Sequence, residues 1–350
     1  MTIDDLSKST GEWLRSEDPP SPVVISSRIR LARNLADHSF LASANDTEKT
    51  EIYRAVAEAA QHVPTLSGGM FVDLQEASKL DRRLLVERHL ISRQHAGAKG
   101  SRGVSVSEFE TTSVMINEED HLRIQGLRSG FHLQPLWQEV SGVDDVFGES
   151  LPLAFDDQFG FLTACPTNVG TGIRVSVMLH LPALKLTKEI DRVVRAARDM
   201  RLAVRGLYGE GTDAIGDLYQ VSNQITLGKT EEEILSTFGQ GIIPKIVDYE
   251  NAARESLIQQ CPYQLEDKIW RAHGVLSNVR CISSEETLKL LSPIRMGIEM
   301  GRYDRIDLKT LNEIFLFTQP AHLQKMSGEL MDGETRGRAR AAFIRSRIKP

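Results

Sequence analysis

The sequence has few cysteines and no long apolar run. Its three cysteines, Cys165, Cys261 and Cys281, form no CxxC pair, which excludes a disulfide framework and a zinc site of the usual spacing. No stretch of about 18 apolar residues is present, so no membrane-spanning helix is expected. The first 22 residues carry acids where a signal peptide carries bases. We therefore expect a protein of the reducing cytoplasm.

An excess of positive charge is also missing. The 350 residues include 42 Lys and Arg against 48 Asp and Glu, a formal net charge of −6, whereas nucleic-acid-binding domains are usually strongly basic. The hydrophobic fraction of 41% and the charged fraction of 26% are those of an ordinary globular protein. We therefore expect neither direct nucleic-acid binding nor membrane insertion.

The common phosphate-binding loops are absent as well. LGKT at 227–230 copies the end of a Walker A motif, but Asn223 stands where the first glycine is required. GTG at 170–172 and GEG at 209–211 lack the spacing of GxGxxG, and there is no HRD or DFG element. Any bound nucleotide therefore needs other groups to neutralise its phosphates.

The spacing of apolar residues predicts both strands and helices. Alternation predicts strands at 23–32, 71–74, 111–117, 121–127, 160–164, 173–182, 202–209 and 218–228. Helical spacing predicts helices at 47–61 with Asp46 as a cap, at 80–92, 133–147, 187–202 and 230–254, and throughout the chain after Cys261. Short links between strands favour an α+β fold, a mostly antiparallel sheet flanked by helices. We divide the chain into a leader (1–22), a catalytic domain (23–255) and a helical C-terminal domain (256–350).

The segment NEEDHLR, 117–123, connects two of the predicted strands. Its three acids followed by His121 and Arg123 fit a site that holds a cation beside an anion, although a solvated turn is the simpler alternative. Arg28 and Arg30 are two residues apart on a strand, so both side chains leave the same face. Guanidinium groups grip phosphate oxygens in bidentate fashion, but a single arginine is more often solvated or salt-bridged.

Two later segments contain further candidates. In LTACPTNVGTGIR, Cys165 precedes a loop rich in glycine and hydroxyl groups, and Arg174 ends the segment. A lone cysteine is usually an inert buried side chain, but backbone N–H groups in such a loop could activate a thiol or meet an anion. RGLYGEGTDAIG places Arg205 and Glu210 on one turn.

Together these segments, with SSRIRLARN and LYQVSNQITLG, resemble the ATP:guanidino phosphotransferases, in the same order and over about residues 23–255. The resemblance implies transfer of a phosphoryl group from MgATP to a guanidinium nitrogen, with Mg²⁺ held mainly by ATP and no protein metal cluster. Glu119 and Glu210 match the carboxylates that hold the guanidinium, and Cys165 matches the cysteine beside its non-reacting nitrogen. Glu118, Asp120 and His121 are expected to be supporting or solvent-facing. The matches to the nucleotide-binding arginines are Arg28, Arg30, Arg123, Arg174 and Arg205.

The layout points to a protein as the phosphate acceptor. Family members that act on small molecules have a further helical domain ahead of the SxRxR strand, but only 25 residues precede Ser26 here. The layout is similar to that of the bacterial protein arginine kinases. This resemblance implies phosphorylation of exposed protein arginines, including those of a CtsR-type stress repressor, and degradation of the products by the ClpC–ClpP machinery. It also implies an activator of the McsA type and a homodimer formed through the C-terminal domain.

The C-terminal segment RGRARA, 336–341, resembles a phosphoarginine-recognition pattern of that family, RDxxRA. Arg336 and Arg340 match its arginines, while Gly337 replaces its acid. A basic helix with solvated arginines is the alternative. Asp213, where glutamate is usual, is a second departure. Two other functions remain open: a kinase of free arginine, and a non-catalytic adaptor that binds phosphoarginine proteins or DNA.

Overall fold

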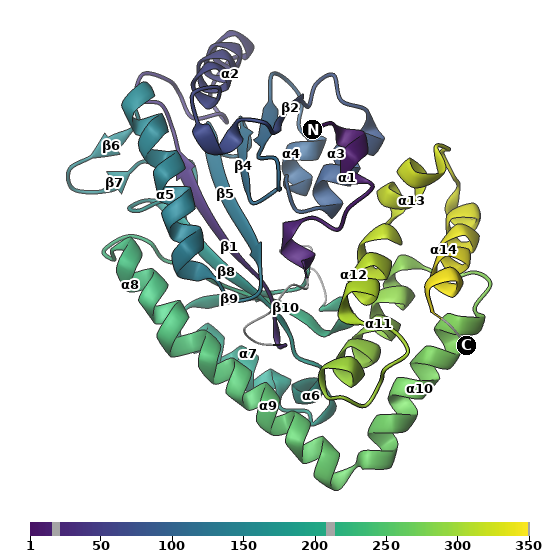
Figure 1. Ribbon diagram of the computed structural model, residues 1–350. Coiled ribbons are helices and arrows are strands. Elements are labelled where there is room, and N and C mark those ends of the chain that lie inside the picture. Colours follow the sequence, from purple (N-terminus) through teal and green to yellow (C-terminus); the bar gives the residue numbers. More distant parts are fainter. Residues whose placement is uncertain (16–21, 208–213, 349–350) are drawn as a thin grey trace.

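The computed structural model describes residues 1–15, 22–207 and 214–348 (Figure 1). Within these residues, eight strands form one antiparallel sheet of order β2-β3-β4-β5-β1-β8-β10-β9. The strands are β1 (Val24–Arg33), β2 (Met70–Asp73), β3 (Gly103–Val106), β4 (Thr112–Ile116), β5 (Leu122–Ser129), β8 (Ile173–His180), β9 (Leu202–Arg205) and β10 (Leu218–Asn223). A separate hairpin consists of β6 (Phe155–Asp156) and β7 (Gly160–Phe161). The predicted antiparallel sheet is confirmed.

Helices surround this sheet and make up the C-terminal region. Those before Cys261 are α1 (Ile3–Leu6), α2 (Asp46–Ala60), α3 (Lys79–Glu87), α4 (Arg93–Gly97), α5 (Leu133–Ser150), α6 (Pro182–Leu186), α7 (Ile190–Asp199), α8 (Glu231–Ser236) and α9 (Ile243–Gln260). Those after it are α10 (Pro262–Asn278), α11 (Ser284–Glu299), α12 (Leu308–Phe317), α13 (Pro320–Ser327) and α14 (Gly333–Arg347). Across the described ranges, none of them combines the length and apolar character that a bilayer span requires.

Helix α5 covers one face of the sheet. On the central strand β1, the fully buried Ile29 and Leu31 alternate with Arg28 and Arg30, which therefore lie on the other face. Helix α5 comes close because β5 has a glycine beneath it: a Cβ on Gly126 would lie 2.5 Å from Val140 and 2.7 Å from Leu136. The apolar face of the sheet is thus sealed, and the arginine face remains for other groups.

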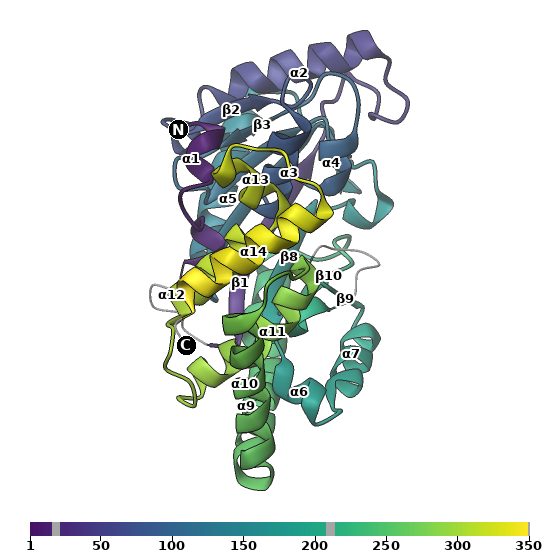
Figure 2. The same ribbon diagram turned by 90° about the vertical axis from the view of Figure 1, so that its right-hand side faces the viewer.

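The N-terminal segment and the C-terminal helices lie on the arginine side of the sheet (Figures 1 and 2). Trp13, in a 3-10 helix at Glu12–Leu14, is only 2% exposed. The centroid of its ring lies 4.5 Å from that of His89 and 5.8 Å from that of Phe315 of α12, and both contacts are edge-on. One hydrophobic core runs from the sheet into α10, α11, α12 and α14, so the two parts share this interior.

Several local expectations were wrong. Asn45, not Asp46, caps α2, because the Asn45 side chain accepts the Glu48 N–H. The helix expected at 80–92 ends at Glu87, two residues before His89 takes a left-handed φ of 59°. Strand β3 was missed, and only two residues of 160–164 are in a strand.

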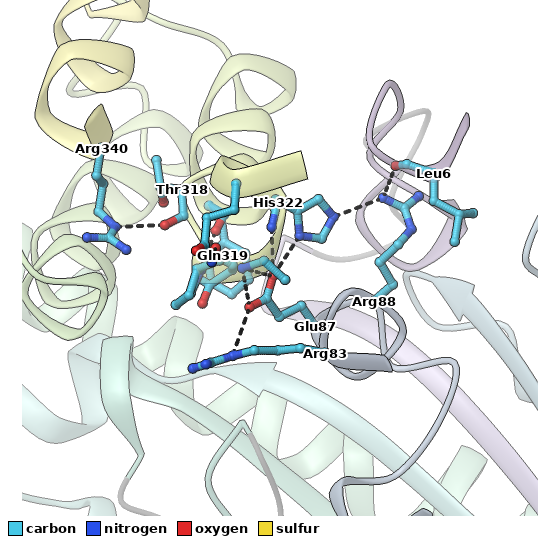
Figure 3. A network of polar contacts seen from close by, with 12 residues as sticks. Leu6, Arg83, Glu87, Arg88, Thr318, Gln319, His322 and Arg340 are labelled. Carbon is cyan, nitrogen blue, oxygen red and sulfur yellow. Dashed lines mark hydrogen bonds and ion pairs between the residues drawn. The ribbon is translucent and has the colours of Figure 1, made fainter. Parts of the chain in front are cut away.

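The end of α3 joins the catalytic part to the C-terminal helices (Figure 3). The Glu87 carboxylate accepts hydrogen bonds from the N–H groups of Ala321 (2.8 Å) and His322 (3.1 Å) and from His322 Nδ1 (2.9 Å). Arg88 donates to the Leu6 carbonyl (2.6 Å) and pairs with Glu110 (2.5 Å). Burial lowers the pKa of His322, so its ring is neutral, with Nδ1 donating and Nε2 facing Arg88 at 3.3 Å.

Replacing Glu87 with alanine should destabilise the whole protein. The change leaves two buried N–H groups at the start of α13 without an acceptor, which costs about 2–4 kcal/mol of unfolding free energy. Thermal unfolding followed by circular dichroism should show a melting temperature several degrees lower. Glu76→Ala, which removes an exposed carboxylate just before α3, is the matched control. Equal melting temperatures for both variants would contradict the assigned role of Glu87.

Candidate active site

Five arginines meet on the open face of the sheet. They are Arg28 and Arg30 on β1, Arg123 on β5, Arg174 on β8 and Arg205 on β9, here called the arginine cluster. Arg30 lies directly opposite Arg174, and Ala32, two residues further on, lies opposite Arg123. Gln220 of β10 is opposite both Met178 and Arg205. Directly opposed residues on paired strands share a face of the sheet, and so do residues an even number apart on one strand. All five arginine side chains therefore leave the same side of the sheet.

The cluster concentrates positive charge. Burial lowers the pKa of Arg28 to about 10, helped by the neighbouring charges of Arg174, Arg123 and Arg205. Burial, together with Arg28, Arg123 and Arg174, also places the pKa of Arg30 well below its usual range. Both keep part of their surface exposed at the mouth of the site. Arg30 Nε is buried and has no hydrogen-bond partner in the described part of the chain, so the cluster is suited to an anion.

The NEED segment makes a tight turn at the edge of the cluster. Asn117 has a left-handed φ of 59°, and its N–H bonds to the His121 carbonyl at 3.0 Å. Arg123 pairs with Glu118 at 2.5 Å and with Glu119 at 2.8 Å. The Glu118 side chain is 2% exposed, whereas that of Glu119 is 37% exposed. Glu119 is therefore the carboxylate that an incoming cation can reach.

The other two members of the turn are supporting residues and do not face solvent. Asp120 and His121 are fully buried. The Asp120 carboxylate accepts from Asn34 Nδ2 at 2.8 Å and from the Ala164 N–H at 2.7 Å. His121 Nδ1 accepts the Leu35 N–H at 3.0 Å, so its Nε2 carries the proton and donates to a backbone carbonyl. The turn is thus tied both to the end of β1 and to the loop that carries Cys165.

Replacing Asp120 with alanine should slow the reaction by about 10²-fold, because it frees the Ala164 loop from the turn and misplaces Glu119 relative to its substrate. The measurement is kcat, with circular dichroism to confirm folding. Asp37→Ala, at an exposed position beyond β1, is the control. An unchanged kcat in a folded Asp120→Ala protein would show that the tie has no role in positioning.

Cys165 precedes a short 3-10 helix, Pro166–Asn168, and is partly exposed. Its Sγ lies 3.1 Å from Thr167 Oγ1, and its carbonyl accepts from Thr163 Oγ1 at 2.8 Å. Because its neighbour Ala164 bonds to Asp120, the loop holds Cys165 near the Glu119 turn. The loop fits closely against β1: a Cβ on Gly172 would lie 2.7 Å from the Ala32 carbonyl oxygen.

Glu210, the second predicted carboxylate, lies outside the described residues, as does Asp213. Strand β9 ends at Arg205 and the described chain resumes at 214, just before a 3-10 helix at Ile215–Asp217. The pairing of Glu210 with Glu119 therefore stays a prediction.

His89 is a site residue that the sequence reasoning missed. With Trp13, Arg28, Ser176 and Gln220, it lines a cavity of about 20 Å³ beside the cluster. Burial first, then Arg28 and Arg93, lowers its pKa to about 3, so the ring is neutral. The sequence predicted a continuous helix through His89, which gave no sign of a role at the site. The helix ends at Glu87 instead, and the chain then turns the His89 ring toward the sheet.

The predicted phosphoarginine residues lie on α14, among the C-terminal helices. Arg340 is 3% exposed and donates to the carbonyls of Thr318 (2.7 Å) and Ile282 (2.8 Å), and Arg336 donates to that of Met331 (2.5 Å). A phosphate would have to replace these carbonyl oxygens as the hydrogen-bond acceptor of Arg336 and Arg340. Phosphoarginine binding therefore stays a prediction. Gly337 has a packing role: a Cβ there would lie 2.6 Å from Cys281 Sγ.

Comparison with known proteins assigns the family. A model of the ATP:guanido phosphotransferase C-terminal catalytic domain matches residues 51–253, and one of the protein-arginine kinase McsB C-terminal domain matches residues 262–350. The protein-arginine kinase of Symbiobacterium thermophilum is 43% identical over 346 residues, 98% of each chain. The chain belongs to the protein-arginine kinases, within the ATP:guanido phosphotransferase family. The protein-arginine kinase of Bacillus subtilis is 41% identical to this chain, over 98% of this chain and 94% of its own length.

Solved structures agree with this assignment at the level of the fold. The duplicated taurocyamine kinase of Schistosoma mansoni, solved with bound transition state analog components, matches with a TM-score of 0.61 at 22% identity. The match covers 82% of this chain and 43% of that duplicated chain. A lombricine kinase matches with a TM-score of 0.57 at 25% identity, over 73% and 76% of the two chains. The family model and the named relatives make this protein an ATP:guanidino phosphotransferase enzyme.

Proposed function

We propose that this enzyme transfers the γ-phosphoryl group of MgATP to arginine side chains of proteins, giving N-phosphoarginine. The observation that carries the proposal is the arginine cluster with Glu119 at its edge: a receptor for phosphates directly beside a receptor for a cation. The named relatives, protein-arginine kinases at 41–43% identity over nearly the whole chain, favour a protein-borne arginine over the free amino acid.

In this mechanism the arginine cluster binds the phosphates and stabilises charge on the phosphoryl group in flight. Five fixed cations on one rigid sheet need no rearrangement when that charge develops. Within the described residues, no group of three His, Cys, Asp or Glu side chains is placed to hold a metal, and the cluster itself offers no oxygen ligand. Mg²⁺ would arrive on ATP and neutralise part of the charge of its phosphates.

The acceptor needs activation because a guanidinium is protonated and its nitrogen lone pairs are delocalised. Glu119 fixes the planar cation by a bidentate contact and directs one nitrogen at the phosphorus for in-line attack. Glu119 or Glu210 accepts the proton as the N–P bond forms, while the bond from the γ-phosphorus to the β,γ-bridging oxygen breaks and ADP leaves. Arg123, which pairs with Glu119 at 2.8 Å, links the cation site to the anion site. Cys165 would lie against the non-reacting nitrogen.

The test is labelling of an arginine-rich protein with γ-labelled ATP and Mg²⁺, after which one portion is treated with acid and a second, untreated portion is mapped by mass spectrometry. We expect label that is lost in acid, because the N–P bond is acid-labile, and that maps to arginine. The matched arm supplies free arginine in place of the protein. Acid-stable phosphate on Ser, Thr or Tyr would contradict the chemistry, and turnover of free arginine alone would make this a metabolite kinase.

The cellular part of the proposal is supported by family membership. Phosphoarginine would mark proteins, among them a CtsR-type repressor, for the ClpC–ClpP machinery in the cytoplasm and so regulate the stress response. A McsA-type activator and a homodimer through residues 256–350 belong to the same proposal, as does phosphoarginine recognition by Arg336 and Arg340.

A further inference from the structure

A large cavity lies between the catalytic part and the C-terminal helices. Its volume is about 720 Å³, and its walls are α3, α4 and the beginnings of α11 and α13. Four basic residues line it: Lys79, Arg82, Arg83 and Arg93. The first three are spaced i, i+3 and i+4, which places them on one side of α3, while Leu84 and Leu85 are buried in the core.

Lys79, Arg82 and Arg83 have little compensating negative charge within the described chain. Glu87 is the acidic residue of the lining, and His322 and two backbone N–H groups already use its carboxylate. Arg83 is 3.8 Å from it, which is a long contact. Lys79 and Arg82 make no ion pair with any carboxylate of the described chain. Behind the wall lies Arg102, whose pKa is lowered first by burial and then by Arg82.

This arrangement does not stabilise the helix that carries it. Lys79 is the first residue of α3, and cations are unfavourable at a helix N-terminus because the helix dipole is positive there. Like charges at i and i+4, as in Lys79 and Arg83, also repel each other. A ligand that carries negative charge gives these residues a favourable role.

The cavity adjoins the candidate active site. Arg93 is the first residue of α4, and Ser92, the preceding residue, caps that helix. The Ser92 hydroxyl donates to Glu118 at 2.6 Å, and Glu118 pairs with Arg123 of the cluster. The hydrogen bond from Ser92 to Glu118 therefore links the wall of the basic cavity to the turn that presents Glu119. A polypeptide with an arginine at Glu119 is in reach of the cavity.

We propose that this cavity binds acidic side chains of the protein substrate, so that the enzyme favours target arginines with Asp or Glu residues nearby. The inference rests on the proposed function and names a substrate preference for it. The volume is within the range of about 300–1,000 Å³ of sites that take whole ligands, well above what one carboxylate needs. The net charge of −6 argues against nucleic acid as the ligand.

The test compares two peptides that contain one arginine each. One has acidic residues at a series of separations from the arginine, and the other has glutamine at the same positions. Wild type is compared with Lys79→Gln/Arg82→Gln, and the matched control is Arg54→Gln/Lys268→Gln, two exposed cations on α2 and α10. Arg83→Gln is a second cavity variant should the double variant fold poorly.

For wild type and the control, we expect a KM about three- to tenfold lower for the acidic peptide. In the cavity variants this difference should disappear, while kcat on the glutamine peptide stays unchanged. Equal KM values in wild type, or a preference that survives in the cavity variants, would overturn the inference, and so would selective competition by single-stranded DNA. Failure of wild type to phosphorylate either peptide would instead contradict the proposed function itself.

Discussion

Replacing Glu119 with glutamine should lower kcat for arginine phosphorylation by about 10²–10⁴-fold. Glutamine keeps the shape of the side chain but carries no negative charge and accepts no proton, so it neither holds the guanidinium cation nor assists its deprotonation. The Glu119 side chain is 37% exposed and its ion pair is with Arg123, so the fold does not depend on it. The loss should appear in kcat, with little change in the melting temperature.

The measurement is initial-rate formation of phosphoarginine at saturating ATP, with ATP affinity determined separately by titration. Glu51→Gln, an exposed carboxylate of α2, is the matched control and should behave as wild type. If Glu119→Gln retained most of its kcat, the assignment of the NEED turn as the receptor for the guanidinium would be wrong. A loss of ATP affinity with unchanged kcat would instead move Glu119 to the nucleotide side of the site.

Replacing Arg30 with methionine should abolish activity and yet make the protein more stable. Burial first, and then the neighbouring charges of Arg28, Arg123 and Arg174, hold the pKa of Arg30 well below the usual range. A lowered arginine pKa means that the folded protein disfavours the charged form, so removing that charge relieves repulsion. After discounting for the exposed part of the cluster, we expect a gain of about 1–2 kcal/mol in unfolding free energy.

The cost of this gain is catalysis, because a cation that stabilises the phosphoryl group in flight is worth about 10³-fold or more. Calorimetry and kinase assays on the same preparation test both expectations. Inorganic phosphate should raise the melting temperature of wild type, since it neutralises the cluster, and should do so less for Arg30→Met. A variant that is both inactive and less stable would mean that Arg30 has a structural role.

The antiparallel sheet and the arginine cluster were accessible to sequence reasoning for the same reason. Residues two apart on a strand share a face, so Arg28 and Arg30 could be assigned to one side before any pairing was known. Which strands are neighbours could not be inferred, because the opposition of Arg30 to Arg174 depends on pairing across long intervening segments. The cluster as a spatial object therefore required the structure.

Burial of polar groups was the hardest feature to predict. Asp120 and His121 read as possible surface residues, since acidic and polar side chains usually face water, yet their partners Asn34, Leu35 and Ala164 come from other parts of the chain. The basic cavity could not be predicted either, because basic residues at helical spacing are equally typical of a solvated helix side. Its meaning depends on the C-terminal helices that close it.

The central place of β1 in the sheet affects how the protein is made. This strand leaves the ribosome well before its two neighbours, β5 and β8, are synthesised. Until then β1 has two unpaired edges, and such edges are prone to non-native association. The nascent chain therefore spends much of its synthesis with its first catalytic strand unprotected, and a chaperone that shields residues 24–33 should increase the yield of native enzyme.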